Sequence, residues 1–319
     1  MRVLVVTNML AGENPTQPSQ GIFVSEQVAA LRLLPDVRVD VISVRGFASR
    51  FAYLRSAAEV LLRVWGTRYD VVHYHFGLTA WTAALVRVLS RARIVVTLHG
   101  SDVLGSKALR FVTLVSVRFA DACIAVSDEI RHAIRTVNPH CVTIPCAVND
   151  ALFKPLDLVP GGRPERIVVF PSSASRQEKD YPLFERVLAI VRARYPLPVF
   201  ERHIDGLDRQ EVCRLLQEAD ALLMTSKREG SPQSVKEAMA CGLPVVSVNV
   251  GDVERLLSGV GACHIAGSRD PEELAELLFR VLEAGERSDG PRRLASGGYL
   301  SSQVAENVLA LYRATLSRR

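Results

Sequence analysis

The feature that most constrains this chain is a repeated alternation of short apolar runs with helical patterns. Apolar, β-branched runs occur in the first half at residues 3–7, 38–44, 71–75, 93–99, 123–127 and 141–145. Helical patterns at 22–34, 78–89 and 128–137 lie between them. Continuous apolar runs are typical of strands that are buried on both faces of a parallel sheet. The alternation predicts βαβ units and a doubly wound α/β sheet.

The alternation stops at residues 152–166 and then begins again. This stretch contains three prolines and a Gly-Gly pair, so we interpret it as a linker. Since 319 residues suit two domains of about 150 each, we predict one Rossmann-like domain over 1–152 and a second over 153–301. Doubly wound sheets bind ligands at the carboxyl ends of their strands, so we expect a cleft between the two domains.

Residues 302–319 are predicted to form a packing helix, whose partner surface the sequence leaves open. Its apolar residues share one helical face; they are Val304, Val308, Leu311, Tyr312 and Leu316.

Composition narrows the class of protein. Hydrophobic residues make up 48% of the chain and charged residues 23%, which favours a packed α/β enzyme over a disordered chain. The six cysteines form no C-x-x-C pair, so we expect free thiols in a reducing cytoplasm. We find no signal peptide and no apolar run of about 18–20 residues, and we therefore predict a cytoplasmic protein.

The basic excess lies entirely in the first half of the chain. Residues 1–152 carry 16 Lys and Arg against 11 Asp and Glu, whereas residues 153–319 carry 23 of each. Residues 45–68 mix five arginines with Phe51, Leu62, Trp65 and other apolar side chains. This segment either packs inward with a solvated basic face or lies as an amphipathic helix on an anionic membrane. Nucleic-acid binding is not expected, because no helix-turn-helix, zinc or RNP pattern appears.

The most informative segment is TSKREGSPQSVKEAMACGLPVVSV, residues 225–248. A strand ends near Ser226, and Ser231-Pro232 is predicted to be the N-cap and first turn of a helix. The N–H groups of Gln233 and Ser234 would then point toward an anion at that helix end. Two carboxylates eight positions apart, Glu229 and Glu237, flank it. Carboxylates suit sugar hydroxyls because each accepts two hydrogen bonds, although two acids at this spacing are common on solvated surfaces.

The segment EGSPQSVKEAMACGLPVVS resembles the E-x7-E motif of retaining glycosyltransferases of the GT-B fold, family 4 type, and its variant is similar to the exopolysaccharide and teichuronic-acid-type subgroup. The resemblance implies two Rossmann-like domains facing each other across a cleft that closes on binding. It also implies that Glu229 contacts the transferred sugar and Glu237 the ribose hydroxyls, while Ser231 to Ser234 hold the diphosphate.

The resemblance extends over most of the chain. The glycine loop after the first strand implies a donor-facing role for Gly21, and VVTLHGSD implies that His99 lies beside the donor sugar. The family arginine and lysine of the donor site correspond to Ala174 and Lys179, with Arg176 as a displaced candidate. Lys179 is therefore expected to bind the diphosphate. IPCAVND replaces the family's usual I-P-N-G-V-D at the interdomain crossing.

The hypothesis also covers the acceptor side of the site and the question of a metal ion. His75 ends the strand 71–75, where it would either contact the acceptor or serve a structural role. No Asp-x-Asp pair occurs in the chain, so Lys179, Arg176 and the helix end would stabilise the leaving phosphate without an essential metal or other cofactor.

We therefore expect a metal-independent retaining hexosyltransferase that uses a nucleotide-sugar donor, UDP-linked by preference, and a saccharide or lipid-linked acceptor. The alternatives are a sugar-nucleotide-binding protein without transferase activity, and an epimerase or phosphorylase on the same fold.

Overall fold

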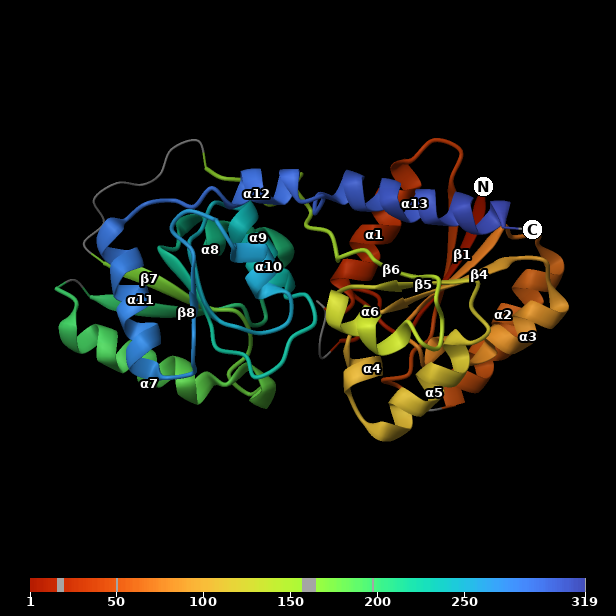
Figure 1. The fold of residues 1–319 in the computed structure, drawn as a ribbon, viewed down its shortest axis with the longest axis horizontal. Coiled ribbons are helices and arrows are strands. Elements are labelled where there is room, and N and C mark those ends of the chain that lie inside the picture. Colours follow the sequence, from red (N-terminus) through yellow and green to blue (C-terminus); the bar gives the residue numbers. More distant parts are fainter. Residues whose placement is uncertain (16–19, 50, 157–164, 197, 319) are drawn as a thin grey trace. The chain divides into compact units, whose positions relative to one another are not determined.

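The computed structural model describes residues 1–15, 20–49, 51–156, 165–196 and 198–318, and much of the predicted linker lies outside them. The chain divides into two compact units, residues 1–147 with 301–319 and residues 148–300. Both are α/β with an all-parallel sheet (Figure 1). The predicted α/β class with two Rossmann-like units is therefore confirmed.

The first unit contains a six-stranded sheet in the order β2-β1-β3-β4-β5-β6. Its strands are β1 (Arg2–Thr7), β2 (Arg38–Ser43), β3 (Val71–His75), β4 (Arg93–Leu98), β5 (Ala122–Ala125) and β6 (Cys141–Thr143). Its helices are α1 (Ile22–Leu33), α2 (Phe51–Gly66), η1 (Thr79–Thr82), α3 (Ala83–Leu89), α4 (Ser101–Leu104), α5 (Lys107–Val117), α6 (Asp128–Ile134) and α13 (Ser301–Ser317). Strand pairing is in register from Arg2 with Arg38 to Thr7 with Ser43.

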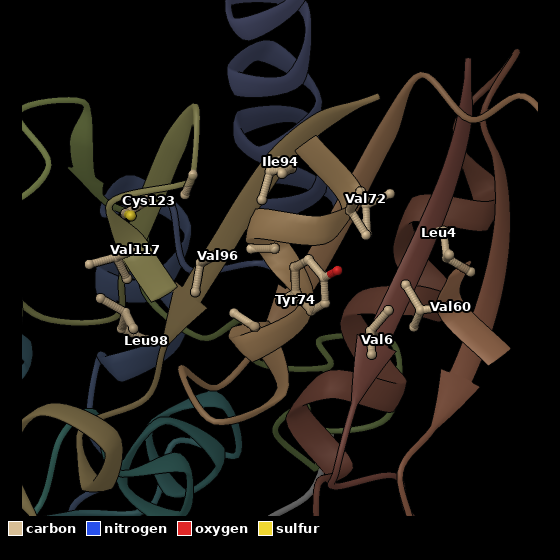
Figure 2. Packing of buried hydrophobic residues seen from close by; sticks show 14 of the residues in the cluster. Leu4, Val6, Val60, Val72, Tyr74, Ile94, Val96, Leu98, Val117 and Cys123 are labelled. Carbon is tan, nitrogen blue, oxygen red and sulfur yellow. The ribbon is translucent and has the colours of Figure 1, made fainter. Parts of the chain in front are cut away.

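Two helical layers cover this sheet. On one face, Val60 of α2 and Val117 near the end of α5 pack with Val6, Tyr74 and Leu98 of the sheet (Figure 2). On the other face, α1 and α13 pack together over the opposite side chains of the same strands (Figure 1). All five residues of β3 are buried, as expected for a central parallel strand.

The second unit contains a five-stranded sheet in the order β11-β10-β9-β7-β8. Its strands are β7 (Arg166–Phe170), β8 (Val199–His203), β9 (Ala221–Met224), β10 (Val245–Val248) and β11 (His264–Ala266). Its helices are η2 (Gln177–Lys179), α7 (Tyr181–Arg194), α8 (Arg209–Glu218), α9 (Gln233–Ala240), α10 (Val253–Leu257), α11 (Pro271–Ala284) and α12 (Gly290–Ser296). Helices α7 and α11 cover one face, and α8, α9 and α10 cover the other.

Local sequence signals account for several helix starts in this unit. Asp208 and Glu211 form a reciprocal capping box at α8, in which each side chain accepts a backbone N–H of the other. Asp270 caps α11, and Pro271 occupies its first position, where no N–H is needed. These caps fix where the helices begin relative to the strands that precede them.

The last helix, α13, belongs to the first unit. The chain leaves the second unit beside the point where it enters, because Val148 N–H donates to Tyr299 O at 2.9 Å. The predicted apolar face of α13 is confirmed: Val304, Val308, Leu311 and Tyr312 are buried. Tyr312 OH lies 2.6 Å from Nδ1 of His73 in the central strand. The partner surface that the sequence left open is thus the first sheet together with α1.

No helix among the described residues is both long enough and apolar enough to cross a membrane.

We expect Tyr312→Ala to lower the free energy of unfolding by about 3–5 kcal/mol, since it opens a cavity against the sheet and removes the hydrogen bond between Tyr312 OH and His73 Nδ1. Urea denaturation followed by circular dichroism measures this change. The exposed neighbour Arg313→Ala is the control and should change it by less than about 0.5 kcal/mol. Equal effects of the two variants would contradict the packing described for α13.

Candidate functional site

The second sheet has a point at which strand order reverses. The chain proceeds from β7 to β8 on one side and then to β9 on the other. Loops that follow β7 and β9 therefore diverge at this point, where doubly wound sheets form a ligand crevice. Lys179 follows β7 and Glu229 follows β9. Lys179 Nζ donates to Glu229 Oε1 at 2.6 Å, so two residues 50 positions apart meet at this reversal of strand order.

Both members of this pair are largely enclosed, with side chains 10% and 13% exposed. A charge-assisted hydrogen bond between enclosed partners fixes both side chains in one geometry. The sequence predicted both residues for the same site, and the structure brings them together.

Further hydrogen bonds hold the loops after β7 and β9 together. Thr225 Oγ1 donates to Lys179 O at 3.0 Å, and Lys227 N–H donates to Glu178 O at 2.8 Å. Arg269 donates to Asp180 Oδ2 at 2.6 Å and to Thr225 O at 2.7 Å. These contacts fix the position of Lys179 relative to the loop that carries Glu229.

Glu237 lies inside α9 and is only 3% exposed. Arg209, from the first turn of α8, donates to Glu237 Oε1 at 2.7 Å. The guanidinium of Arg209 also lies 4.6 Å from the ring centroid of Phe153. Each carboxylate of the E-x7-E pair is therefore held by its own cation, Lys179 for Glu229 and Arg209 for Glu237. Nothing in the sequence pattern singled out Arg209.

The prediction that Ser231 caps α9 is wrong. Pro232 occupies the N-cap position without a side-chain cap, and the helix begins at Gln233. Ser231 Oγ instead donates to Asp252 Oδ2 at 2.7 Å, because Asp252 and the buried Lys236 compete successfully for its hydroxyl. Gln233 and Ser234 do occupy the first turn of α9, as predicted, so their N–H groups lie at its N-terminal end.

Arg176 lies in the loop after β7, in contact with another residue of that loop. Its side chain is 54% exposed, and one guanidinium nitrogen lies 2.6 Å from Glu178 Oε1. The pKa of Glu178 is lowered: burial raises it, but hydrogen bonds and charge, among them those of Arg176, outweigh that effect. The donor-binding role of Arg176 remains a prediction.

Three histidines form a cluster at the carboxyl ends of β3 and β4 in the first unit. His75 Nδ1 lies 3.1 Å from His99 Nε2, and their rings stack with centroids 5.3 Å apart. His73 Nε2 contacts Thr97 Oγ1 at 2.7 Å. His99 is partly exposed, whereas His75 is only 1% exposed. Of the two histidines predicted for the site, only His99 is accessible, and the buried His75 contacts its Nε2. The acceptor-binding role of His75 remains a prediction.

Asp102 organises the backbone around His99. This carboxylate is buried and accepts the N–H groups of His99 and Gly100 at 3.1 and 2.9 Å. It also accepts the N–H of Gly77, which follows β3, at 3.1 Å. Burial raises the pKa of Asp102, although these hydrogen bonds act in the opposite direction. One side chain thus joins the loops after β3 and β4.

Gly21 stands at the N-terminal end of α1 with φ of +80°. A Cβ at this position would lie 2.4 Å from the carbonyl carbon of Met9, so only glycine allows this approach. Two residues later, in the first turn of α1, the ring of Phe23 lies 4.7 Å from the His99 ring, measured between centroids. The donor-binding role of Gly21 remains a prediction.

The sequence analysis gave no role to four residues that shape these sites: Arg209, Lys236, Asp252 and Asp102. Each acts through a tertiary contact to a loop, and such contacts cannot be predicted from the local spacing of residues in the sequence. Across the described residues no group of three or more His, Cys, Asp or Glu side chains has the arrangement of a metal site.

The two parallel-sheet units, with functional candidates at the carboxyl ends of their strands, define the class of two-domain Rossmann-like proteins to which GT-B enzymes belong. Residues 2–152 match the family model "Glycosyltransferase Family 4", and residues 166–284 match "Glycosyl transferases group 1". The chain therefore belongs to the family 4 glycosyltransferases.

Curated relatives agree with this assignment, and solved structures share the fold. The phosphatidyl-myo-inositol mannosyltransferase of Propionibacterium freudenreichii subsp. shermanii is 27% identical over 252 residues, 72% of this chain and 64% of that protein. Sucrose-phosphate synthase from Thermosynechococcus elongatus has the same fold, with a TM-score of 0.82 at 16% identity and full coverage of both chains. HepE of Anabaena in complex with UDP has a TM-score of 0.74 to this chain at 15% identity, over 98% of this chain and 100% of that one. The matches to the curated relatives span less than two thirds of their lengths.

We expect the stability of the protein to fall with acidification through the buried histidines. Burial lowers the pKa of His75 to about 3, whereas the unfolded ring titrates near 6.5. The unfolded state therefore gains a proton below pH 6.5 that the folded state does not. Protonation of the unfolded His75 ring removes about 1.4 kcal/mol of unfolding free energy per pH unit as pH falls from about 6.5 toward 3.

Urea denaturation at pH 7.0 and pH 5.5 measures this slope, which should be shallower in His75→Phe. The exposed His132→Gln serves as the control and should keep the slope of the unmodified protein. If His75→Phe kept that slope as well, the neutral state assigned to His75 would be wrong.

Proposed function

We propose that this protein is a retaining, metal-independent glycosyltransferase that moves a hexose-type sugar from a UDP-sugar to a saccharide or lipid-linked acceptor. The observation that carries the proposal is the 2.6 Å contact between Lys179 and Glu229 at the strand-order reversal of the second sheet. Glu237 lies in α9, the helix that follows this loop, and forms an ion pair with Arg209. These are the positions at which the family motif carries its donor-binding residues.

The chemistry of sugar transfer assigns a task to each of these groups. When the anomeric bond breaks, negative charge grows on the leaving diphosphate and must be stabilised. In our proposal Lys179 and the N–H groups of Gln233 and Ser234 perform this task. Glu229 accepts hydrogen bonds from hydroxyls of the transferred sugar, and Glu237 accepts hydrogen bonds from the two ribose hydroxyls. The Lys179–Glu229 pair would then open, so that each partner contacts the donor.

Two features of the chain support the proposed metal independence. Some enzymes hold a metal for this step with an Asp-x-Asp pair, and the chain has no such pair. Lys179 supplies a fixed cation at the crevice instead. UDP is the proposed nucleotide because a solved protein of this fold, HepE, was obtained in complex with UDP.

In the first unit we propose that His99 contacts the donor sugar. It is the accessible member of the histidine cluster, and its backbone is fixed by Asp102. His75 lies beneath it and holds Nε2 of His99 in one orientation. Burial lowers the pKa of His75 to about 3, so His75 meets His99 as a neutral hydrogen-bonding ring.

We further propose that the first unit contacts an anionic membrane at the cytoplasmic side, through α2 and its neighbours. Helix α2 buries Ser56, Ala57, Val60 and Val64, yet it exposes large apolar residues as well. Trp65 is 81% exposed, Phe51 74% and Leu62 73%. The expected inward packing of residues 45–68 thus accounts for only part of their apolar side chains.

The same outer layer continues over α3 and α5. Eleven of the 14 large apolar side chains that are exposed among the described residues fall between positions 47 and 119. Exposed basic side chains accompany them on or beside these helices: Arg55, Arg63, Arg68, Arg87, Arg91, Lys107, Arg110 and Arg118. The one exposed acid on α2, α3 and α5 is Glu59. Apolar side chains with cations suit the boundary between headgroups and acyl chains of an anionic bilayer.

We expect UDP, rather than GDP, ADP or TDP, to raise the melting temperature of the protein. A nucleotide at 100 times its dissociation constant adds about 2.7 kcal/mol of stability, which a thermal-shift assay resolves. Lys179→Met and Glu237→Gln should each weaken UDP binding about tenfold or more, because each removes a charge-assisted contact. Glu185→Gln removes an exposed acid from the same unit and should bind normally. If none of the four nucleotides shifted the melting temperature, the donor site would be refuted.

We expect the protein to sediment with vesicles of phosphatidylglycerol and phosphatidylcholine, but not with phosphatidylcholine alone. Binding should weaken as salt rises from 0.05 to about 0.5 M, because part of it is electrostatic. Trp65→Glu should reduce it at least tenfold without changing the UDP thermal shift. Leu33→Glu alters an equally exposed apolar residue on α1, across the sheet, and should bind as before. Equal losses in both variants would contradict the proposed surface.

A further inference from the structure

A lysine is completely buried next to the proposed donor site, and the function proposed above gives it no task. Lys236 precedes Glu237 in α9 and is 0% exposed. Its Nζ donates to Ser231 Oγ at 2.9 Å, and that hydroxyl donates to Asp252 Oδ2 at 2.7 Å. The three side chains form a continuous hydrogen-bonded chain from α9, through the loop before it, to the start of α10.

This series of hydrogen bonds ends at Asp252, in a segment that packs against the loop of Glu229. Asp252 is 8% exposed and follows Gly251, whose φ is +59°. A Cβ on Gly251 would lie 2.6 Å from Gly230 O and 3.0 Å from Glu229 O. The segment before α10 therefore lies directly against the backbone of Glu229 and Gly230, an approach that only glycine permits at this φ. The loop is enclosed between Gly251 on one side and Lys236 on the other.

A buried lysine is costly unless its charge is compensated, so its presence requires a reason. The compensation includes Asp252. Burial raises the pKa of Asp252, while Lys236 and Ser231 act to lower it. Apolar side chains would fill the same space at less cost. They could not hold the hydroxyl of Ser231, which sits two residues after Glu229.

The outer cations of the site differ from Lys236 in what they touch. Lys179 and Arg209 contact the two carboxylates of the E-x7-E pair and would have to release or share them when a donor binds. Lys236 Nζ instead donates to Ser231 Oγ at 2.9 Å, in the loop between the two acids. It therefore acts on the position of the loop between the two acids.

We propose that Lys236 is a positioning residue: acting through Ser231 and Asp252, it holds the loop that carries Glu229 in the geometry that receives the diphosphate of the donor. The inference rests on the donor site proposed above and assigns its internal support. The ammonium does not touch the donor. Its removal takes away the hydrogen bond that Ser231 Oγ accepts from α9, and the loop then loses the fixed spacing between Glu229 and the N-terminal end of α9. Affinity falls because the donor must order the loop when it binds.

The test is a double-mutant cycle on UDP affinity, measured by titration calorimetry with the full chain well below the melting temperature of every variant. We expect Lys236→Met and Ser231→Ala each to weaken UDP binding about tenfold. The double variant should bind no more weakly than the weaker single variant, because both changes break the same chain of contacts. Ser231→Thr keeps the hydroxyl and should restore binding to within about threefold. A merely structural role would lower melting temperature without this coupling.

Lys154→Met controls for the loss of a positive charge elsewhere in the unit, since Lys154 is exposed, and it should bind UDP as the unmodified protein does. Circular dichroism confirms that each variant is folded before titration. Unchanged UDP affinity in folded Lys236→Met would overturn the inference and leave the donor site standing. Additive losses in the double variant would also overturn it, because they mean that Lys236 does not act through Ser231. If the unmodified protein bound no UDP, both the inference and the proposed function would fall.

Discussion

The structure depends on one constraint: a parallel sheet is apolar on both faces and must be covered on both. In the first unit the chain between β1 and β6 supplies α2, α3, α5 and α6 to one face but only α1 to the other. The missing cover comes from α13, whose Tyr312 reaches the central strand at His73. Completing this layer buries β3 entirely and so sets His73 and His75 in a dry interior. The neutral state of those rings, and the orientation of His99, follow from that burial.

Both sites arise from strand order rather than from any local motif. In each sheet the chain moves first to one side of its starting strand and then to the other, and the loops at this reversal diverge. The second sheet places Lys179 and Glu229 there, and the first places His75 at the end of β3 and the glycine loop after β1. Contacts between loops then fix the geometry, as Arg269 does for Thr225 and Asp102 does for Gly77. A charged or polar side chain that joins two loops is the common device.

The sequence was informative where chemistry and periodicity are local. The apolar runs located the strands to within a few residues, and the E-x7-E spacing located Glu229 in the loop before α9 and Glu237 inside that helix. The prediction failed at Ser231, because a helix-cap signal cannot reveal a competing partner 21 positions away at Asp252. Arg209, Lys236 and Asp102 were missed for the same reason: each matters through the residue it reaches. Which face of α2 would be covered was likewise undetermined, because exposed and buried apolar residues alternate around that helix.

The return of α13 to the first unit has a consequence for the order in which the protein is made. Residues 148–300 form a unit of their own, whose two ends meet in a parallel β-bridge between Val148 and Leu300. This unit therefore has all its parts before the final helix leaves the ribosome. The first unit, although synthesised earlier, lacks one cover of its sheet until then. Nascent chains would therefore hold an exposed apolar sheet face throughout translation of the second unit, a period in which chaperone binding is favoured.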